Sequence, residues 1–245
     1  MTEVFPKAPL TEALIDIRLK LPGNVCLADL EKLHDRIRDQ YPARKTRTMW
    51  QGTFEMKDAK DPLQRAQFQV DGYVFTSGDG RQVVQYRLDG FTFSRLRPYT
   101  RWEEVFSEAQ RLWGIYVIGT KPLLITGVAV RYINSIEIPS KTLDYDEYFT
   151  AAPRIPPALP QGLSHFFTRL AIPFPDRGAL AVITQTPSDT RDPINTVIIL
   201  DIAVSKETNL SPEDRMIFEV LSILRDIKNE IFFSSVTDKT KELFR

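Results

Sequence analysis

The feature that most constrains this fold is an order of elements that occurs twice. Each half of the chain predicts a strand, a helix, three strands and a long helix. When the segment from Pro9 is aligned with the segment from Pro122, the apolar positions of the two first strands coincide. In the same alignment Arg18 falls on Arg131. The coincidence of order, register and an arginine predicts an internal repeat.

We therefore expect two α+β repeats, residues 1–121 and 122–245, in one compact unit. The expected fold class is α+β, an antiparallel sheet with long helices at Thr100–Val117 and Ser211–Phe232 on one face. This element order resembles the TATA-binding-protein-like and helix-grip folds, and a resemblance of layout carries no function. The three strands expected within the first repeat are Arg47–Met56, Ala66–Thr76 and Gln82–Leu96.

The first strand carries a polar cluster on one side. Glu12, Asp16 and Arg18 alternate with apolar residues and share the face opposite them, where Arg131 is also expected. One interpretation is a salt-bridge network on a wetted face, worth roughly 0 to 1 kcal/mol per pair. The other is a ligand-binding floor, where the arginines bind a carboxylate or phosphate. The sequence leaves both open.

The neighbouring "RYIN" stretch predicts buried polar groups. Alternation places Tyr132 and Asn134 on the face away from Arg131. Tyr132 should pack under the helices, and Asn134 should satisfy a buried backbone group there.

Composition excludes several classes of protein. Lys+Arg and Asp+Glu both number 32, and the zero net charge argues against nucleic-acid binding, which needs an excess of cations. Cys26 is the only cysteine, so the chain has no disulfide framework, as is typical of a reducing cytosol. The first residues are too polar for a signal peptide, and no apolar run approaches the roughly 20 residues of a membrane span. We expect a cytoplasmic protein without membrane contact.

The sequence offers no catalytic constellation. His34 and His165 lie in no nucleophile motif and are better explained as packed or surface histidines. The chain has no HExxH or CxxC pattern, and "SGDG" is a hairpin turn rather than a phosphate loop. We therefore predict no catalytic residue, no metal and no cofactor.

The strands of the second half are apolar on both faces. An antiparallel sheet with one face in water should alternate, so something must cover the second face. The candidates are the proline-rich loop, a ligand, a second copy of the chain, or another protein. This pattern favours a protein partner or homo-oligomer. The strands that show it are Leu163–Ile172, Ala179–Thr186 and Asn195–Ser205.

Five motifs give the chain a family resemblance. They are "KAPLTEALIDIR", "RPYTRWEEV", "RYINSIEIP", "LDIAV" and "FFSSVTDKTKELF", which cover both halves in order. Together they resemble a sporadically distributed family of bacterial proteins of about 250 residues. That family has no established activity to carry over. Its patchy distribution is like that of mobile or antiviral defence genes.

Three functions follow as hypotheses, and the zero net charge disfavours the third, a nucleic-acid saddle. The first is a non-enzymatic cytosolic interaction protein, an accessory in a mobile or defence cassette, that binds a partner through the second half of its sheet. The second is a sensor or enzyme for a small anionic ligand, such as a nucleotide, held by Arg18, Arg131, Glu12 and Asp16.

Overall fold

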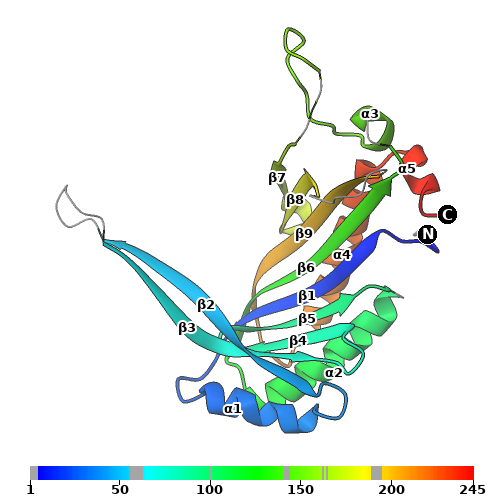
Figure 1. Ribbon diagram of the computed structural model, residues 1–245. Helices are drawn as coiled ribbons and strands as arrows, with labels where there is room; N and C mark the ends of the chain where they lie inside the picture. The colour runs from blue at the N-terminus through cyan, green and yellow to red at the C-terminus, as the bar shows by residue number, and fades with distance from the viewer. Residues whose placement is uncertain are drawn as a thin grey trace.

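A computed structural model describes residues 5–55, 63–99, 101–140, 144–161, 163, 165–188 and 195–245. Met56 and Thr100, which end a predicted strand and begin a predicted helix, lie outside these ranges. The described strands form one antiparallel sheet in the order β2-β3-β4-β5-β1-β6-β9-β8-β7 (Figure 1). The strands are β1 Leu10–Lys20, β2 Ala43–Glu55, β3 Leu63–Thr76, β4 Gln82–Arg87, β5 Gly90–Leu96, β6 Leu124–Ile138, β7 Thr168–Phe174, β8 Ala179–Pro187 and β9 Thr196–Leu210.

Helices occupy a smaller part of the described chain. Two are long and pack on the central strands, and the others are short. In the part of the chain that the structure describes, no helix is both long and apolar enough to cross a membrane. The helices are α1 Leu27–Lys32, α2 Trp102–Thr120, α3 Tyr145–Tyr148, α4 Met216–Ser235 and α5 Asp238–Glu242, with 3-10 turns η1 Leu33–Arg36 and η2 Pro175–Arg177.

The centre of the sheet is the pair β1–β6. Because side chains alternate along a strand, β1 turns Ile15 and Ile17 to the buried face, where each is 1% exposed. The antiparallel register sets Ile15 beside Val130 and Ile17 beside Val128. Thus β1 and β6 give the core one continuous apolar surface.

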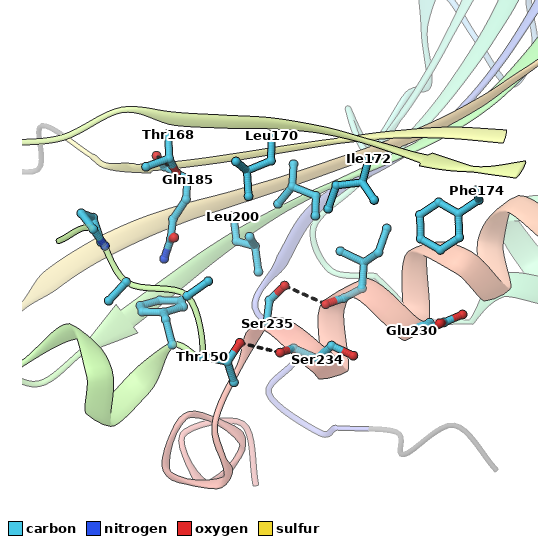
Figure 2. Close-up of a pocket in the computed structure, with 16 residues that line it drawn as sticks. Thr150, Thr168, Leu170, Ile172, Phe174, Gln185, Leu200, Glu230, Ser234 and Ser235 are labelled. Carbon is cyan, nitrogen blue, oxygen red and sulfur yellow. Dashed lines mark hydrogen bonds between the residues drawn. The ribbon is translucent and has the colours of Figure 1, made fainter.

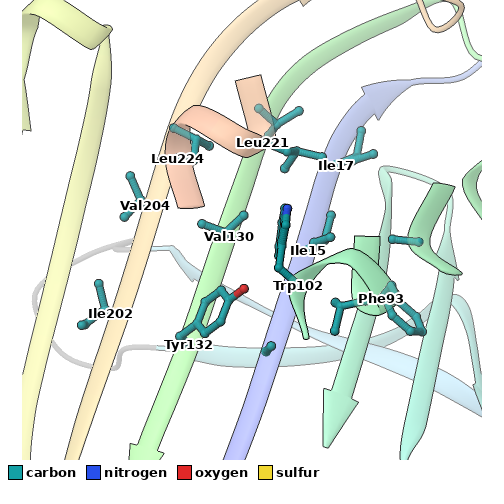
Figure 3. Packing of buried hydrophobic residues seen from close by; sticks show 14 of the residues in the cluster. Ile15, Ile17, Phe93, Trp102, Val130, Tyr132, Ile202, Val204, Leu221 and Leu224 are labelled. Carbon is teal, nitrogen blue, oxygen red and sulfur yellow. The ribbon is translucent and has the colours of Figure 1, made fainter. Parts of the chain in front are cut away.

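Side chains of α2 and α4 cover that surface (Figure 3). Trp102 from α2 and Leu221 and Leu224 from α4 belong to the same buried cluster as the strand residues beneath them. The two helices meet through Phe106 and Phe218, whose rings contact edge to face at 5.5 Å between centroids. This packing places the α4 residues that follow Leu224 over β6.

The predicted fold class is wrong. The described chain is dominated by a single nine-stranded antiparallel sheet, not by an α+β layout with long helices covering one face. The helices reach only part of the sheet, since β2 and β3 extend away as a two-stranded arm and β7 and β8 form the opposite margin (Figure 1). The TATA-binding-protein-like or helix-grip-like layout is withdrawn with it.

The repeat of strand order also differs in detail. The predicted strand Gln82–Leu96 is in fact the hairpin β4–β5, in which Tyr86 pairs with Phe91 across a turn at Leu88–Asp89. The first half therefore contributes five strands and the second half four. The division into repeats 1–121 and 122–245 stays a prediction.

Candidate functional site

The residues of the predicted polar cluster do not converge on one point. Arg18 lies opposite Gly127 on β6, whereas Arg131 lies opposite Leu14, four residues further along. At about 3.3 Å per residue, the two positions are roughly 13 Å apart. The sheet therefore holds the two arginines at separate places.

Each arginine of this cluster has its own acid on β9. Arg18 Nη2 donates to Glu207 Oε1 at 2.6 Å. Arg131 donates from Nε and Nη2 to Asp201, at 2.9 and 2.6 Å. The hydrogen bond to Asp201, helped by the charges of Asp201 and Glu12, raises the pKa of Arg131 against the effect of burial. Both guanidinium groups are thus compensated on the exposed surface.

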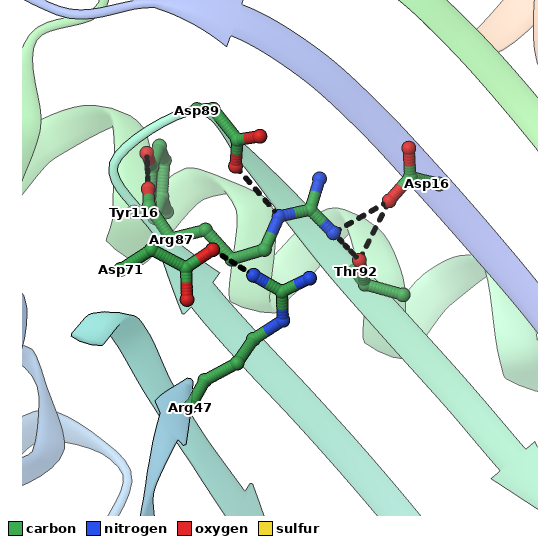
Figure 4. A network of polar contacts seen from close by, with 7 residues as sticks. All are labelled: Asp16, Arg47, Asp71, Arg87, Asp89, Thr92 and Tyr116. Carbon is green, nitrogen blue, oxygen red and sulfur yellow. Dashed lines mark hydrogen bonds and ion pairs between the residues drawn. The ribbon is translucent and has the colours of Figure 1, made fainter. Parts of the chain in front are cut away.

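Asp16 belongs to a network that the sequence did not reveal (Figure 4). Its partner is Arg87 on β4, which is 8% exposed and donates to Asp16 Oδ1 and Asp89 Oδ1, both at 2.9 Å. Thr92 donates to Asp16 at 2.6 Å, and Tyr116 donates to the Arg87 carbonyl at 2.7 Å. Every charge around Arg87 therefore faces an opposite charge.

Close approach explains how Arg87 fits. A Cβ at Gly90 would collide with the Arg87 guanidinium, so glycine is needed where the side chain crosses β5. Ligand binding at Glu12, Asp16, Arg18 and Arg131 stays a prediction; the structure pairs Asp16, Arg18 and Arg131 separately, with Arg87, Glu207 and Asp201.

A cavity lies on the opposite face, between the start of β1 and the middle of β6. Its volume is about 600 Å³, within the range of small-molecule sites. It is bounded by the segment before β1, the start of α2, the middle of β6 and the last turns of α4. The lining residues are Phe5, Ala8, Pro9, Leu10, Tyr99, Arg101, Trp102, Glu103, Glu104, Tyr132, Asn134, Arg225, Lys228, Asn229, Phe232 and Phe233.

Aromatic contacts hold the wall nearest the N-terminus. Phe5 packs on Phe233 and Phe244, with centroid distances of 6.2 and 5.4 Å. The Lys7 backbone N–H donates to the Phe244 carbonyl at 3.0 Å. Two segments far apart in the sequence thus form one side of the cavity.

Lys228 is the unusual residue of this cavity. It lies on α4 between Leu224 and Ile231, at the i+4 and i−3 positions that face the sheet. Its Nζ sits 3.8 Å from the centroid of the Tyr132 ring, a cation–π contact. Among the described residues no carboxylate forms an ion pair with it.

Electrostatics leave Lys228 about half protonated near pH 7. Burial first, and then the charge of Arg225, lower the pKa of Lys228 to about 7, while Asp226 acts in the opposite direction. The Arg225 guanidinium lies 5.8 Å from the Trp102 ring centroid and 3.4 Å from the exposed Asp226 carboxylate. Lys228 and Arg225 therefore both line the cavity, and the carboxylates near them, on Glu103, Glu104 and Asp226, are exposed.

The hydroxyl of Tyr132 is the second unusual group. The residue is 3% exposed, and its Oη has no hydrogen-bond partner in the part of the chain that the structure describes. Its ring meets Tyr99 edge to face at 6.1 Å. Burial, and then the neighbouring Tyr99 phenol, raise the pKa of Tyr132 well above its usual range. The hydroxyl therefore stays protonated, and a ligand at this place competes with the weak hydrogen bond that the Tyr99 phenol offers it.

Asn134 and His34 have the structural roles that the sequence predicted for them. Asn134 is buried, and its Nδ2 donates to the Leu200 carbonyl at 3.0 Å, so its predicted structural role is confirmed. His34 is also packed: it stacks on Phe75 and bonds to the Tyr41 carbonyl at 2.8 Å. No group of His, Cys, Asp and Glu among the described residues could hold a metal.

Comparisons with known proteins do not assign the chain to a family. The chain matches no protein-family model and no curated protein. The resemblance drawn from the five motifs stays a prediction, and function is argued from the site alone.

Proposed function

We propose that the protein binds a small anionic ligand in the cavity lined by Lys228, Arg225 and Tyr132. The single observation that carries this is the desolvated Lys228, whose Nζ lies over the Tyr132 ring and pairs with no carboxylate among the described residues. A carboxylate or phosphate between Lys228 and Arg225 accepts from both and from Tyr132 Oη. This keeps the predicted ligand class but moves the site to the other face of the sheet.

Charge distribution across the cavity supports an anion deep inside it. Lys228, Arg225 and Tyr132 are buried or half-buried, whereas Glu103 and Glu104 are exposed at the rim. Water screens the rim carboxylates, while the low dielectric of the interior strengthens the deeper charges. The ligand's anion therefore meets the bases and not the acids.

Aromatic side chains define the rest of the ligand. Trp102, Phe232 and Phe233 line the space beyond the bases. Such a wall favours a flat or apolar body, since rings bind it by stacking and burial. The ligand class is a small molecule with one acidic group and a ring, as in an aromatic carboxylate or a nucleoside monophosphate.

A thermal-shift and calorimetry panel tests the proposal. The probes are inorganic phosphate, benzoate and nucleoside monophosphates, because a ligand of the native state raises its stability by mass action. Lys228→Met and Tyr132→Phe should weaken binding, and Lys32→Met, at an exposed helical lysine, should not. Failure of every probe to bind the wild type, or equal binding by Lys228→Met, would contradict the site.

The pH dependence gives a second readout. A bound anion stabilises the ammonium form of Lys228, whose pKa in the free protein is about 7. Benzoate affinity should therefore fall as pH rises above 7, by up to about tenfold per unit. The Lys228→Met variant should show a flat profile over the same range.

A second candidate function is binding of a partner protein at the β7–β8 margin. Leu170 and Leu180 are 50% and 43% exposed on opposite faces of this margin. Such residues are typical of contact surfaces when they gather at an edge strand. Light scattering after size-exclusion chromatography tests it, and a strict monomer that captures no partner from a native extract would contradict it.

We also propose that this activity operates in the cytosol. The support is the lone free cysteine, Cys26, which is exposed and would be open to oxidation elsewhere. Fractionation of native cells with an antibody against the protein tests this placement.

A further inference from the structure

A second cavity lies at the other margin of the sheet. It has a volume of about 470 Å³ and is enclosed by β7, β8, β9, the end of α4 and the segment after α3 (Figure 2). Its surface is mainly apolar, because β7 turns Leu170 and Ile172 toward it, and Leu200 and Ile231 close the far side. This is a different site from the cavity of Lys228, and it shares none of the lining residues of that cavity.

One polar group in this cavity has no partner. Gln185 on β8 is 7% exposed, and its Nε2 forms no hydrogen bond with any described residue. Figure 2 shows its amide reaching from the sheet into the space between Leu200 and Thr150. A buried donor without an acceptor is unfavourable, because it has lost its hydrogen bond to water on folding. An acceptor from outside the chain would replace that hydrogen bond.

Apart from the exposed Ser234, the other polar groups at the rim are already used. Thr150 Oγ1 donates to the Ser234 carbonyl at 2.5 Å, and Ser235 Oγ donates to the Ile231 carbonyl at 2.7 Å. The carboxylate of Glu230 pairs with Arg177 at 2.8 Å. Gln185 is therefore the group left to recognise a ligand.

This cavity lies on the apolar strands of the second half, for which the sequence predicted a cover. Leu170 and Ile172 stay 50% and 38% exposed although they face the same side as the core. The proline-rich loop does not cover them, because its chain leaves the sheet after contributing Ala151 to Pro153 to the rim (Figure 1). The apolar face that the sequence predicted to be covered is therefore open, and a ligand has room to cover it.

We propose that this cavity binds an uncharged molecule with an apolar body and a single carbonyl acceptor, such as a ketone, ester or amide. The Gln185 Nε2 donates to the carbonyl, and the apolar body lies on Leu170, Ile172 and Leu200. A carboxylate fits poorly, because no Lys or Arg stands among the lining residues to offset the cost of burying its charge. Charge therefore separates this ligand from the one proposed for the Lys228 cavity.

Binding of 2-nonanone, followed by ligand-observed NMR and thermal shift, tests the proposal. The wild type should bind it, and nonanoate, with the same chain but a negative charge, should bind more weakly. Gln185→Leu keeps the side-chain size and removes the donor, and should weaken 2-nonanone binding by about tenfold. The matched control Gln69→Leu, at an exposed position on β3, should bind as the wild type does.

A second variant keeps the test independent of the folding of Gln185→Leu. Leu170→Asn lies on an exposed edge and should also weaken 2-nonanone binding. Absence of binding to the wild type, or unchanged binding by both variants, would overturn the proposal. So would a dimer of the wild type that Leu170→Asn converts to a monomer, since a second copy would then cover the face. Benzoate binding should be unchanged in either variant, which separates this result from the fate of the Lys228 site.

Discussion

The two charged clusters of this protein, one on each face of the sheet, differ in how far their charges are compensated. On one face, Arg87 is surrounded by Asp16, Asp89 and Thr92. On the other, Lys228 faces an aromatic ring, and the hydroxyl of that ring has no partner among the described residues. A network that satisfies itself stabilises the fold, whereas an unsatisfied set of donors is free for a ligand.

Removal of Arg87 should give the largest effect on stability. Arg87→Met leaves Asp16 partly buried without its cation, and should lower the free energy of unfolding by roughly 3 kcal/mol. Urea unfolding measures it. A loss below about 1 kcal/mol would show that water compensates the Asp16 charge once Arg87 is removed. The two clusters would then not differ in how far their charges depend on protein partners.

For Lys228, in contrast to Arg87, loss of the charge should make the folded protein more stable. Its pKa is about 7 in the folded protein and 10.5 when unperturbed, so between these values the unfolded chain binds more protons. The wild type should therefore gain stability relative to Lys228→Met as pH rises from 7 to 10, by at most about 1.4 kcal/mol per pH unit. Urea unfolding at pH 7, 8 and 9 measures the slope, and a constant difference would show that Lys228 is not desolvated.

A pair of tyrosines sharpens the comparison further. Tyr116 donates to the Arg87 carbonyl at 2.7 Å, so Tyr116→Phe should cost roughly 1 kcal/mol. The Tyr132 hydroxyl has no described partner, so Tyr132→Phe should leave the stability of the free protein unchanged or raise it. Thermal unfolding of both variants without ligand checks this. Equal losses would mean that Tyr132 has an internal partner after all.

The exposed arginines should give the smallest effects. Arg18 and Arg131 pair with acids on a surface where each side chain is nearly half exposed, at 46% and 47%. Replacement of either by alanine should lower the free energy of unfolding by less than about 1 kcal/mol. This loss should become smaller as the salt concentration rises. The double variant should also bind benzoate like the wild type. Loss of benzoate binding there would return the anion site to the face first predicted.

Alternation predicted the central strands well, because the two faces of β1 and β6 meet different environments. The faces of Ile15, Arg18, Tyr132 and Asn134 follow directly from it. The fold class failed because helices were expected to cover a whole face. One missed cue was Asp89-Gly90, a dipeptide typical of a hairpin, which divides β4 from β5.

The site could be predicted only in part. Lys228 could have been noticed as a charge within the apolar stripe of α4, between Leu224 and Ile231. Its partner Tyr132 lies far away in the sequence, and no local pattern indicates that the two meet. Arg87 and Asp16 were hidden for the same reason. Pairings between distant strands decide which charges are compensated, and they follow from the register of the sheet.

The wall formed by Phe5, Phe233 and Phe244 has a consequence for the timing of folding. During synthesis, the segment before β1 emerges before its partners in and after α4, so the Lys228 cavity can close only once those later segments have been made. Until then Phe5 is exposed and the two bases remain hydrated. Closing so long a loop has an entropic cost, which the aromatic contacts of this wall help to offset. Occupancy of the cavity would thus mark chains whose folding is finished.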